Sequence, residues 1–264
     1  MINFRSYGKS PFDIAVIHGG PGAPGYMAPV ARELSSSMGV LEPLQTESSL
    51  EGQIQELHDV LINNANLPVK LIGSSWGAWL SFILTAKYPS FVKKLILIGS
   101  GPFEEKYALN ILKTRLERLS KKERREALSF MTALEELNND QDKNTILDQL
   151  GSLFTKADAY DPLTLNTSDL KVQFHIYQSI WNEAANLRQS GELLKLGKQI
   201  QCPVLAIHGD YDPHPAEGVQ KPLYTVLEHF QFILLKNCGH LPWIEREAKD
   251  KFYEILKKEL RMPL

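Results

Sequence analysis

The amino-acid sequence predicts an α/β fold in which helices cover both faces of a mostly parallel sheet and a helical cap is inserted into the chain. Two observations support this prediction. In the first third of the chain, short apolar runs of strand length alternate with segments of helical periodicity, which is typical of a parallel sheet. A long, charged segment of helical periodicity then separates these runs from two further apolar runs near the C-terminus.

Short apolar runs bounded by turn residues indicate strands buried in the sheet. In chain order these runs cover residues 13–18, 39–43, 69–73, 95–98, 204–208 and 232–235. The run at 39–43 carries the weakest signal.

Three segments have the periodicity of helices. Ser48 and Glu51 have the spacing of a capping box, so we expect a helix to begin there. Its apolar face would be formed by Leu50, Ile54, Leu57 and Leu61. The segment 76–87 is apolar almost all round, which indicates a helix buried within the domain. An amphipathic helix is predicted at 247–260.

The long charged segment predicts the domain organisation. Residues 1–101 and 200–264 are expected to form the core domain, and residues 102–199 the inserted helical cap. Ligands of open α/β sheets bind at the carboxyl edge of the strands, so an insertion at this edge would cover the binding site. The alternative is that the segment consists of ordinary crossover helices.

The composition narrows the class of partner. The chain has 264 residues and a formal net charge of −2, which argues against nucleic acid or an anionic membrane as its main partner. The basic run 121–125 is interrupted by Glu123 and is interpreted as a solvated helix face. A small-molecule substrate is therefore expected, and the oligomeric state is left open.

Compartment and redox state follow from three features. No apolar window reaches the ~20 residues of a membrane span, and residues 1–5 lead into no apolar run of signal-peptide length. The two cysteines cannot form a disulfide scaffold for a chain of this size. Cys202 precedes one predicted strand and Cys238 follows the next, so they should lie at opposite sheet edges and stay unpaired. We expect a cytoplasmic protein.

Residues 73–77, Gly-Ser-Ser-Trp-Gly, match the pattern G-x-S-x-G between a predicted strand and a predicted helix. A serine hydroxyl is a weak nucleophile that must be presented to a base and to a substrate. A sharp strand-to-helix turn presents it, and glycines two residues before and after the serine remove side chains that would clash. Ser75 is therefore predicted to be a nucleophile. The alternative is a plain tight turn.

A glycine-rich segment, His18-Gly19-Gly20-Pro21-Gly22, follows the first predicted strand. Beside such an elbow, a loop of this kind supplies one backbone N–H group to a developing oxyanion, and the residue after the nucleophile supplies the other. Gly20 and Trp76 are predicted to form this oxyanion hole. His18 is interpreted as a packing and hydrogen-bonding residue of the turn, and a turn without a ligand is the alternative.

An acid and a base are expected after the nucleophile in the chain. Asp210 and Asp212 follow the strand predicted at 204–208, and His240 follows the last predicted strand. Three sites that each lie just past the carboxyl end of a strand predict a catalytic triad of Ser75, Asp212 and His240, with Asp210 as a competing acid.

The segment 208–214 also allows a metal site, because alternate residues of an extended segment point the same way. Its two carboxylates and two imidazoles would suit zinc or iron; they belong to His208, Asp210, Asp212 and His214. This alternative leaves the elbow and His240 unexplained. No metal and no organic cofactor is therefore expected.

These motifs resemble those of the α/β-hydrolase superfamily, and in particular its proline iminopeptidase branch. Residues 18–22 match the oxyanion loop of that branch, and residues 75–77 match its elbow. Members usually carry an Asp-Gln-Arg-Gly segment between these motifs, and this chain departs from them at residues 40–46. The resemblance covers the core on both sides of the predicted cap and implies the α/β-hydrolase fold.

The resemblance also bears on the acid and the base. Gly209 with Asp212, three residues on, matches the acid motif of the wider superfamily, and Gly239 with His240 matches its base motif. The spacing favours Asp212 over Asp210, which then serves the loop as aspartates do in turns.

The resemblance implies a serine hydrolase that cleaves a small ester or amide through an acyl-enzyme. The first alternative is a proline iminopeptidase-like aminopeptidase, because that branch binds the free amine of its substrate with glutamates, at least one from the cap. Residues 181–183, Trp-Asn-Glu, loosely resemble the corresponding cap segment. Glu183 is thus a candidate substrate-binding residue, or simply a solvated helix residue. A member of the fold that binds a small molecule without turnover is the second alternative.

Overall fold

The computed structural model describes residues 3–137, 139–164 and 172–262. Met1 and Ile2, part of the N-terminal stretch considered above, lie outside them. The strands form one sheet in the order β1-β3-β2-β4-β5-β6-β7. Their bounds are β1 Phe4–Tyr7, β2 Phe12–Ile17, β3 Gly39–Pro43, β4 Val69–Ser74, β5 Val92–Ile98, β6 Val204–Gly209 and β7 Phe230–Leu235.

The predicted fold class is confirmed. Every strand expected from the sequence is present, with ends that agree to within a few residues, and these strands pair in parallel. The strand β1 was not predicted. It is a short edge strand that pairs antiparallel with β3 and is only partly buried, so it lacks the continuous apolar run of the inner strands.

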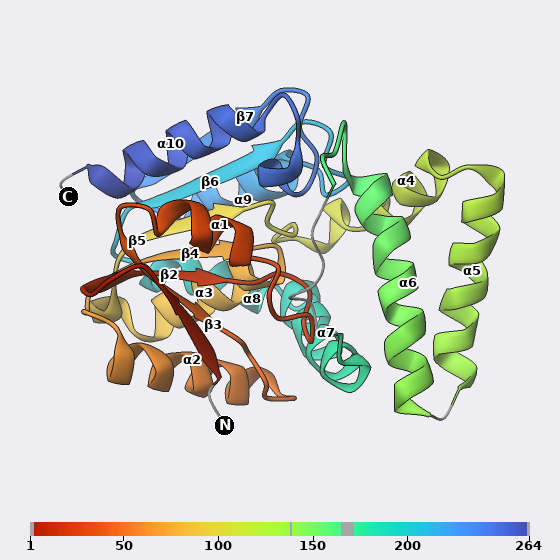
Figure 1. Cartoon of the computed structure of the whole chain (residues 1–264), viewed down its shortest axis with the longest axis horizontal. Helices are drawn as coiled ribbons and strands as arrows, with labels where there is room; N and C mark the ends of the chain where they lie inside the picture. Colours follow the sequence, from red (N-terminus) through yellow and green to blue (C-terminus); the bar gives the residue numbers. More distant parts are fainter. Residues whose placement is uncertain (1–2, 138, 165–171, 263–264) are drawn as a thin grey trace.

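Helices cover both faces of this sheet (Figure 1). Because neighbouring residues of a strand point to opposite faces, Leu71 packs in the cluster with α2, α3, α8 and α9, whereas Ile72 packs with α1 and α10. The bounds are α1 Ala28–Leu34, α2 Leu50–Asn64, α3 Trp76–Lys87, α8 Glu192–Lys195, α9 Glu217–Val226 and α10 Lys249–Arg261. The helix α3 is buried almost all round, as predicted.

The start of α2 corrects one prediction. The residue that caps this helix is Ser49, whose hydroxyl accepts a hydrogen bond from the amide of Gly52. Ser48 was expected to cap it as part of a capping box with Glu51. A difference of one residue is enough to move the side-chain oxygen out of reach of the first free amides of the helix.

Four longer helices lie between β5 and β6 in the chain: α4 Ile111–Arg118, α5 Lys121–Glu136, α6 Asp140–Asp158 and α7 Phe174–Gln189. Buried residues of α5 and α6, together with Leu119 and with Phe174 of α7, form a separate apolar cluster. The helices α5 and α6 stand apart from the sheet (Figure 1). Further along α7, Ile176 and Ile180 belong to the main core. The helix α7 therefore links the two clusters, and the cap bounds of 102–199 stay a prediction.

Two further observations concern the chain as described. Within the described ranges, no helix has the length and hydropathy needed to cross a membrane. Cys202 and Cys238 are both free thiols, as predicted. Cys202 precedes β6 and Cys238 follows β7, and these strands run parallel in register from Val204 and Phe230 onward, which places the cysteines at opposite ends of the pair.

Candidate active site

The elbow at Ser75 lies between β4 and α3 and has the strained backbone that the motif predicts. Ser75 has φ +52° and ψ −116°, a region that residues with a side chain rarely occupy. A Cβ atom at residue 73 would lie 2.1 Å from the carbonyl oxygen of Gly77, and one at residue 77 would lie 2.3 Å from that of Ile17. Only glycine fits at both positions, so the turn can close tightly and present the serine.

The end of β5 connects Ser75 with His240. The amide of Ser75 donates a hydrogen bond to the carbonyl of Ile98, the last residue of β5 (2.9 Å). A Cβ atom at the next residue, Gly99, would lie 2.5 Å from the carbonyl oxygen of His240 and 3.2 Å from its Nδ1. Ser75 is half-buried and His240 is buried. The end of β5 thus lies beside both Ser75 and His240.

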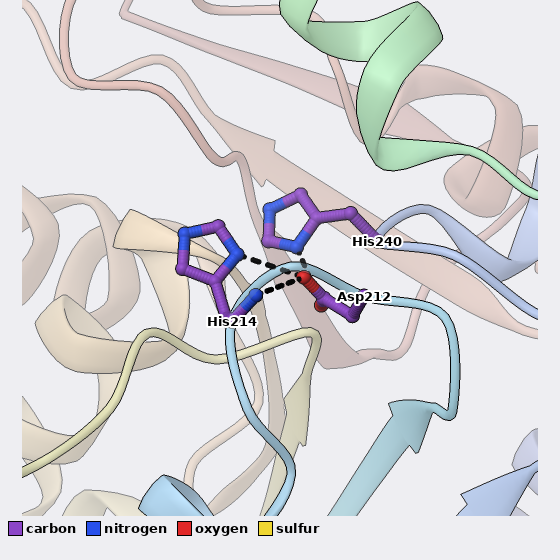
Figure 2. A group of neighbouring side chains, drawn as sticks. All are labelled: Asp212, His214 and His240. Atoms are coloured by element: carbon purple, nitrogen blue, oxygen red, sulfur yellow. Dashed lines mark hydrogen bonds and ion pairs between the residues drawn. The ribbon is translucent and has the colours of Figure 1, made fainter. Parts of the chain in front are cut away.

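Figure 2 shows how His240 meets its partner. The Nδ1 atom of His240 lies 2.7 Å from Oδ2 of Asp212, a fully buried carboxylate. The competing residue Asp210 faces elsewhere, since it accepts the amide of Cys238 (3.3 Å) and lies 3.5 Å from the Lys236 ammonium. The structure therefore places Asp212, and not Asp210, on His240.

Burial and charge shift the protonation of this pair. Burial by itself would raise the pKa of Asp212, but the neighbouring histidines, with His240 foremost, hold that pKa well below its usual range. Burial by itself would lower the pKa of His240, but the charge and hydrogen bond of Asp212 raise it above the usual value. Asp212 is therefore ionised at neutral pH and can stabilise the protonated form of His240.

A second imidazole lies on the same carboxylate. The Nδ1 atom and the backbone amide of His214 both contact Oδ1 of Asp212, at 2.8 and 2.9 Å (Figure 2). The ring of His214 stacks on that of His240, with centroids 4.5 Å apart. From the sequence, His214 was a candidate metal ligand. Its position two residues after Asp212 indicated that it lies near the predicted acid, but its hydrogen bond to that carboxylate could not be predicted from the sequence.

The four residues of the metal alternative do not come together at one site. Of these residues, Asp210 faces Cys238 and Lys236, and His208 binds the carbonyl of His214 through Nε2 (2.8 Å). The side chains whose ligand atoms do lie close enough together to hold a metal ion are a different set, Asp212, His214 and His240. The Nδ1 atoms of both histidines are hydrogen-bonded to Asp212 and are therefore not available as metal ligands.

The glycine-rich loop passes directly beside Ser75. A Cβ atom at residue 19 would lie 2.9 Å from the Cβ of Ser75. His18 is fully buried, with Nδ1 2.9 Å from the carbonyl of Gly19, and burial lowers its pKa to about 4. This fits the predicted packing role of His18. Trp76 begins α3, and its indole N–H donates to the side chain of Gln53 (3.0 Å). The oxyanion roles of Gly20 and Trp76 stay predictions.

The loop that carries His240 is tied to the end of α6. The amide of His240 donates to the carbonyl of Asp158 (2.9 Å). The fully buried carboxylate of Glu245 accepts the amide of Gly239 (2.8 Å) and the amides of residues 160 and 161 (2.9 Å each). Nothing in the sequence pattern pointed to Asp158 or Glu245, because the contacts that join α6 to this loop are between residues distant in the chain.

Glu183 lies on α7 and is only half-buried. Both of its carboxylate oxygens lie near the amide of Leu50, at 3.2 and 3.3 Å, at the first residue of α2. A carboxylate is stabilising at a helix N-terminus, where free amides and the helix dipole meet it. The observed partner of Glu183 is therefore a helix end, and a role in substrate binding stays a prediction.

Comparison with known proteins gives a family match. A family model described as the alpha/beta hydrolase fold matches residues 64–247, a range that includes the elbow, Asp212 and His240. No curated protein matches the sequence.

Several solved structures are similar over nearly the whole chain. VinJ is 17% identical with a TM-score of 0.70, covering 97% of this chain and 93% of its own. Proline iminopeptidase from Mycobacterium smegmatis is 16% identical with a TM-score of 0.64, covering 97% and 93%. The meta-cleavage product hydrolase from Pseudomonas fluorescens is 17% identical with a TM-score of 0.63, covering 97% and 92%. At these identities the likeness concerns the fold.

Proposed function

The chain belongs to the alpha/beta hydrolase fold family, and we propose that it is a serine hydrolase in which Ser75, His240 and Asp212 form the catalytic triad. The observation that carries this proposal is the contact between Asp212 and His240 (2.7 Å). This pair lies beside Gly99 at the end of β5, and the strained elbow of Ser75 is hydrogen-bonded to the preceding residue, Ile98. A strained backbone and a buried, oppositely shifted acid–base pair are features that mark functional sites.

The proposed reaction is acyl transfer. Nε2 of His240 takes the proton of the Ser75 hydroxyl as Oγ of Ser75 bonds to the substrate carbonyl carbon. Asp212 stabilises the imidazolium that results. The electron pair of the carbonyl moves to its oxygen, which accepts hydrogen bonds from the amides of Gly20 and Trp76. Collapse of this intermediate expels the leaving group, which takes the proton from His240. Water then repeats the sequence and frees the acid and Ser75.

The proposed substrate is a small ester or amide, and neither a metal nor an organic cofactor enters the reaction. The aminopeptidase alternative is supported by the resemblance of residues 18–22 and by the proline iminopeptidase among the similar structures. The position of Glu183 favours an ester instead. A carboxylate already engaged at the first turn of α2 is a poor anchor for a substrate ammonium, which needs an available counter-charge when it leaves water.

The test is a comparison of two substrate classes. Purified protein is assayed with p-nitrophenyl esters of short acids and with proline p-nitroanilide, alongside Ser75→Ala and Glu183→Gln. We expect ester hydrolysis that Ser75→Ala abolishes, and slow anilide cleavage at best. Loss of anilide cleavage alone in Glu183→Gln would favour the aminopeptidase. Absence of turnover with all substrates, together with tight binding of a small molecule, would favour the non-catalytic alternative.

A further inference from the structure

The carboxylate of Asp212 is hydrogen-bonded to the rings of His214 and His240. Oδ2 faces Nδ1 of His240 at 2.7 Å, and Oδ1 faces Nδ1 of His214 at 2.8 Å. The backbone amide of His214 is a further donor to Oδ1, at 2.9 Å. A triad needs only one imidazole on its acid, so the second one requires its own explanation.

We propose that His214 is a positioning residue for the triad: its Nδ1–H group holds Oδ1 of Asp212, so that Oδ2 stays directed at His240. This inference rests on the proposed function. Two donors on Oδ1, one from the backbone and one from the ring, fix the carboxylate plane. His214 is fixed in turn, because Nε2 of His208 contacts its carbonyl oxygen at 2.8 Å.

The two histidines differ in their ability to hold a proton. Burial lowers the pKa of His214 to about 4, although Asp212 acts against this, whereas the pKa of His240 is raised. His214 is thus a neutral donor at neutral pH. It leaves the negative charge of Asp212 for His240, which alone becomes charged during the reaction.

Other charged groups near the cluster do not replace His214. The Arg115 guanidinium is engaged by Asp158 of α6 in a bidentate pair, at 2.7 and 2.6 Å. Arg115 acts to lower the pKa values of both His240 and His214, and Asp158 acts to raise that of His240. His208 lies 3.5 Å from Oδ2 of Asp212 and adds to the forces that lower the pKa of that carboxyl.

Two substitutions separate the hydrogen bond from the ring. His214→Phe keeps a ring to stack on His240 but has carbon in place of Nδ1. His214→Asn loses the ring but carries an N–H donor on Cγ, where histidine carries Nδ1. His229→Phe serves as the matched control, because His229 is exposed and lies just before β7, at the opposite end of the strand from Gly239 and His240.

The experiment measures kcat and kcat/KM for ester hydrolysis from pH 5 to 9, with thermal unfolding to check the fold. We expect His214→Phe to lose on the order of tenfold in kcat with little change in KM, since a hydrogen bond to a charged group is removed. The acid limb of its pH–rate profile, which reports protonation of His240, should move to higher pH. With one donor fewer on Asp212, the negative charge of this carboxylate acts more strongly on His240 and raises its pKa. His214→Asn should recover most of the loss, and His229→Phe should match the wild type.

A role in packing alone would not move the acid limb. The proposal is overturned if His214→Phe matches the wild type within twofold with an unchanged limb, or if His214→Asn is as impaired as His214→Phe. A proton NMR titration of the His240 ring in the wild type and His214→Phe provides a readout without substrate. If the wild type does not hydrolyse any ester, the proposed function fails. The titration then still decides: a shift between the two proteins supports the sharing of Asp212, and identical titrations contradict it.

Discussion

The amide of Ser75 donates to the carbonyl of Ile98, and this hydrogen bond extends the pairing of β4 with β5 into the elbow. The next residue, Gly99, leaves no room for a side chain because the backbone and ring of His240 occupy that space. The neighbouring strands β4 and β5 therefore set the relative positions of Ser75 and His240. The predictions below follow from this arrangement.

The first prediction concerns the nucleophile. Ser75→Ala should reduce kcat on the order of 10⁶-fold, because loss of a triad nucleophile leaves only binding and oxyanion contacts. Ser74→Ala is the matched control, since Ser74 is buried one residue earlier in the same turn and should not be able to replace Ser75. Steady-state kinetics on a chromogenic ester, with circular dichroism to verify folding, measure both. If Ser75→Ala kept more than a few per cent of the wild-type activity, Ser75 would be excluded as the nucleophile.

A second prediction separates the two aspartates. Asp212→Asn should lower kcat on the order of 10⁴-fold, because the amide cannot stabilise a charged His240 and favours the wrong tautomer. Asp210→Asn should stay within a few fold of the wild type, as Asp210 contacts Cys238 and Lys236 instead. The same ester assay compares the two variants. Equal losses would mean that Asp210 also supports the base.

A third prediction concerns the pH dependence of stability. The pKa of His18 is about 4 in the folded protein and about 6.5 when unfolded, so the unfolded state binds its proton first. Above pH 6.5, His18 is neutral in both states, and its protonation does not lower the free energy of unfolding. This free energy should fall by about 1.4 kcal/mol per pH unit for this group between pH 6.5 and 4.

The measurement is urea unfolding at a series of pH values for the wild type and His18→Asn. The asparagine can still donate to the carbonyl of Gly19 but does not titrate in this range. Its unfolding free energy should decline less steeply below pH 6.5. The carboxylates titrate in both proteins and cancel in the difference. Parallel curves would show that His18 is not held neutral by burial.

A fourth prediction tests the tie between α6 and the loop of His240. Glu245→Gln should destabilise the protein on the order of 2–4 kcal/mol, because a buried carboxylate that accepts three amides is replaced by a group with only one acceptor oxygen. Glu247→Gln is the control, since Glu247 is exposed two residues later and should change stability by less than about 0.5 kcal/mol. Urea unfolding compares them, and equal effects would contradict the assigned role.

The sequence was most informative where structure depends on local features. The apolar run 69–73, the turn at Ser75 and the buried helix 76–87 could be predicted together, because glycine spacing and apolar periodicity act over a few residues. The helices α1 and α9 were not predicted. Both are short, and α9 contains Pro222 in its interior, which the sequence rules treat as a break.

Contacts between distant parts of the chain explain the remaining differences. Asp158 accepts the amide of His240 from 82 positions earlier in the chain, and Glu245 joins this loop to Tyr160, 85 positions earlier. No motif marks such pairs. Glu183 was selected from a loose resemblance of the cap, whereas its observed partner is the amide of Leu50, 133 residues earlier. His214 was noticed for its residue type, but its hydrogen bond to Asp212 depends on how the loop after β6 folds.

The central claim is that Ser75 is an activated nucleophile, and covalent labelling tests it most directly. The wild type, Ser75→Ala and Asp212→Asn are treated with a fluorophosphonate probe at pH 8, digested, and analysed by peptide mass spectrometry. We predict one adduct, on Ser75 of the wild type, with labelling absent from Ser75→Ala and strongly slowed in Asp212→Asn. A folded wild-type protein that remains unlabelled, or that carries the adduct on another serine, would contradict the account.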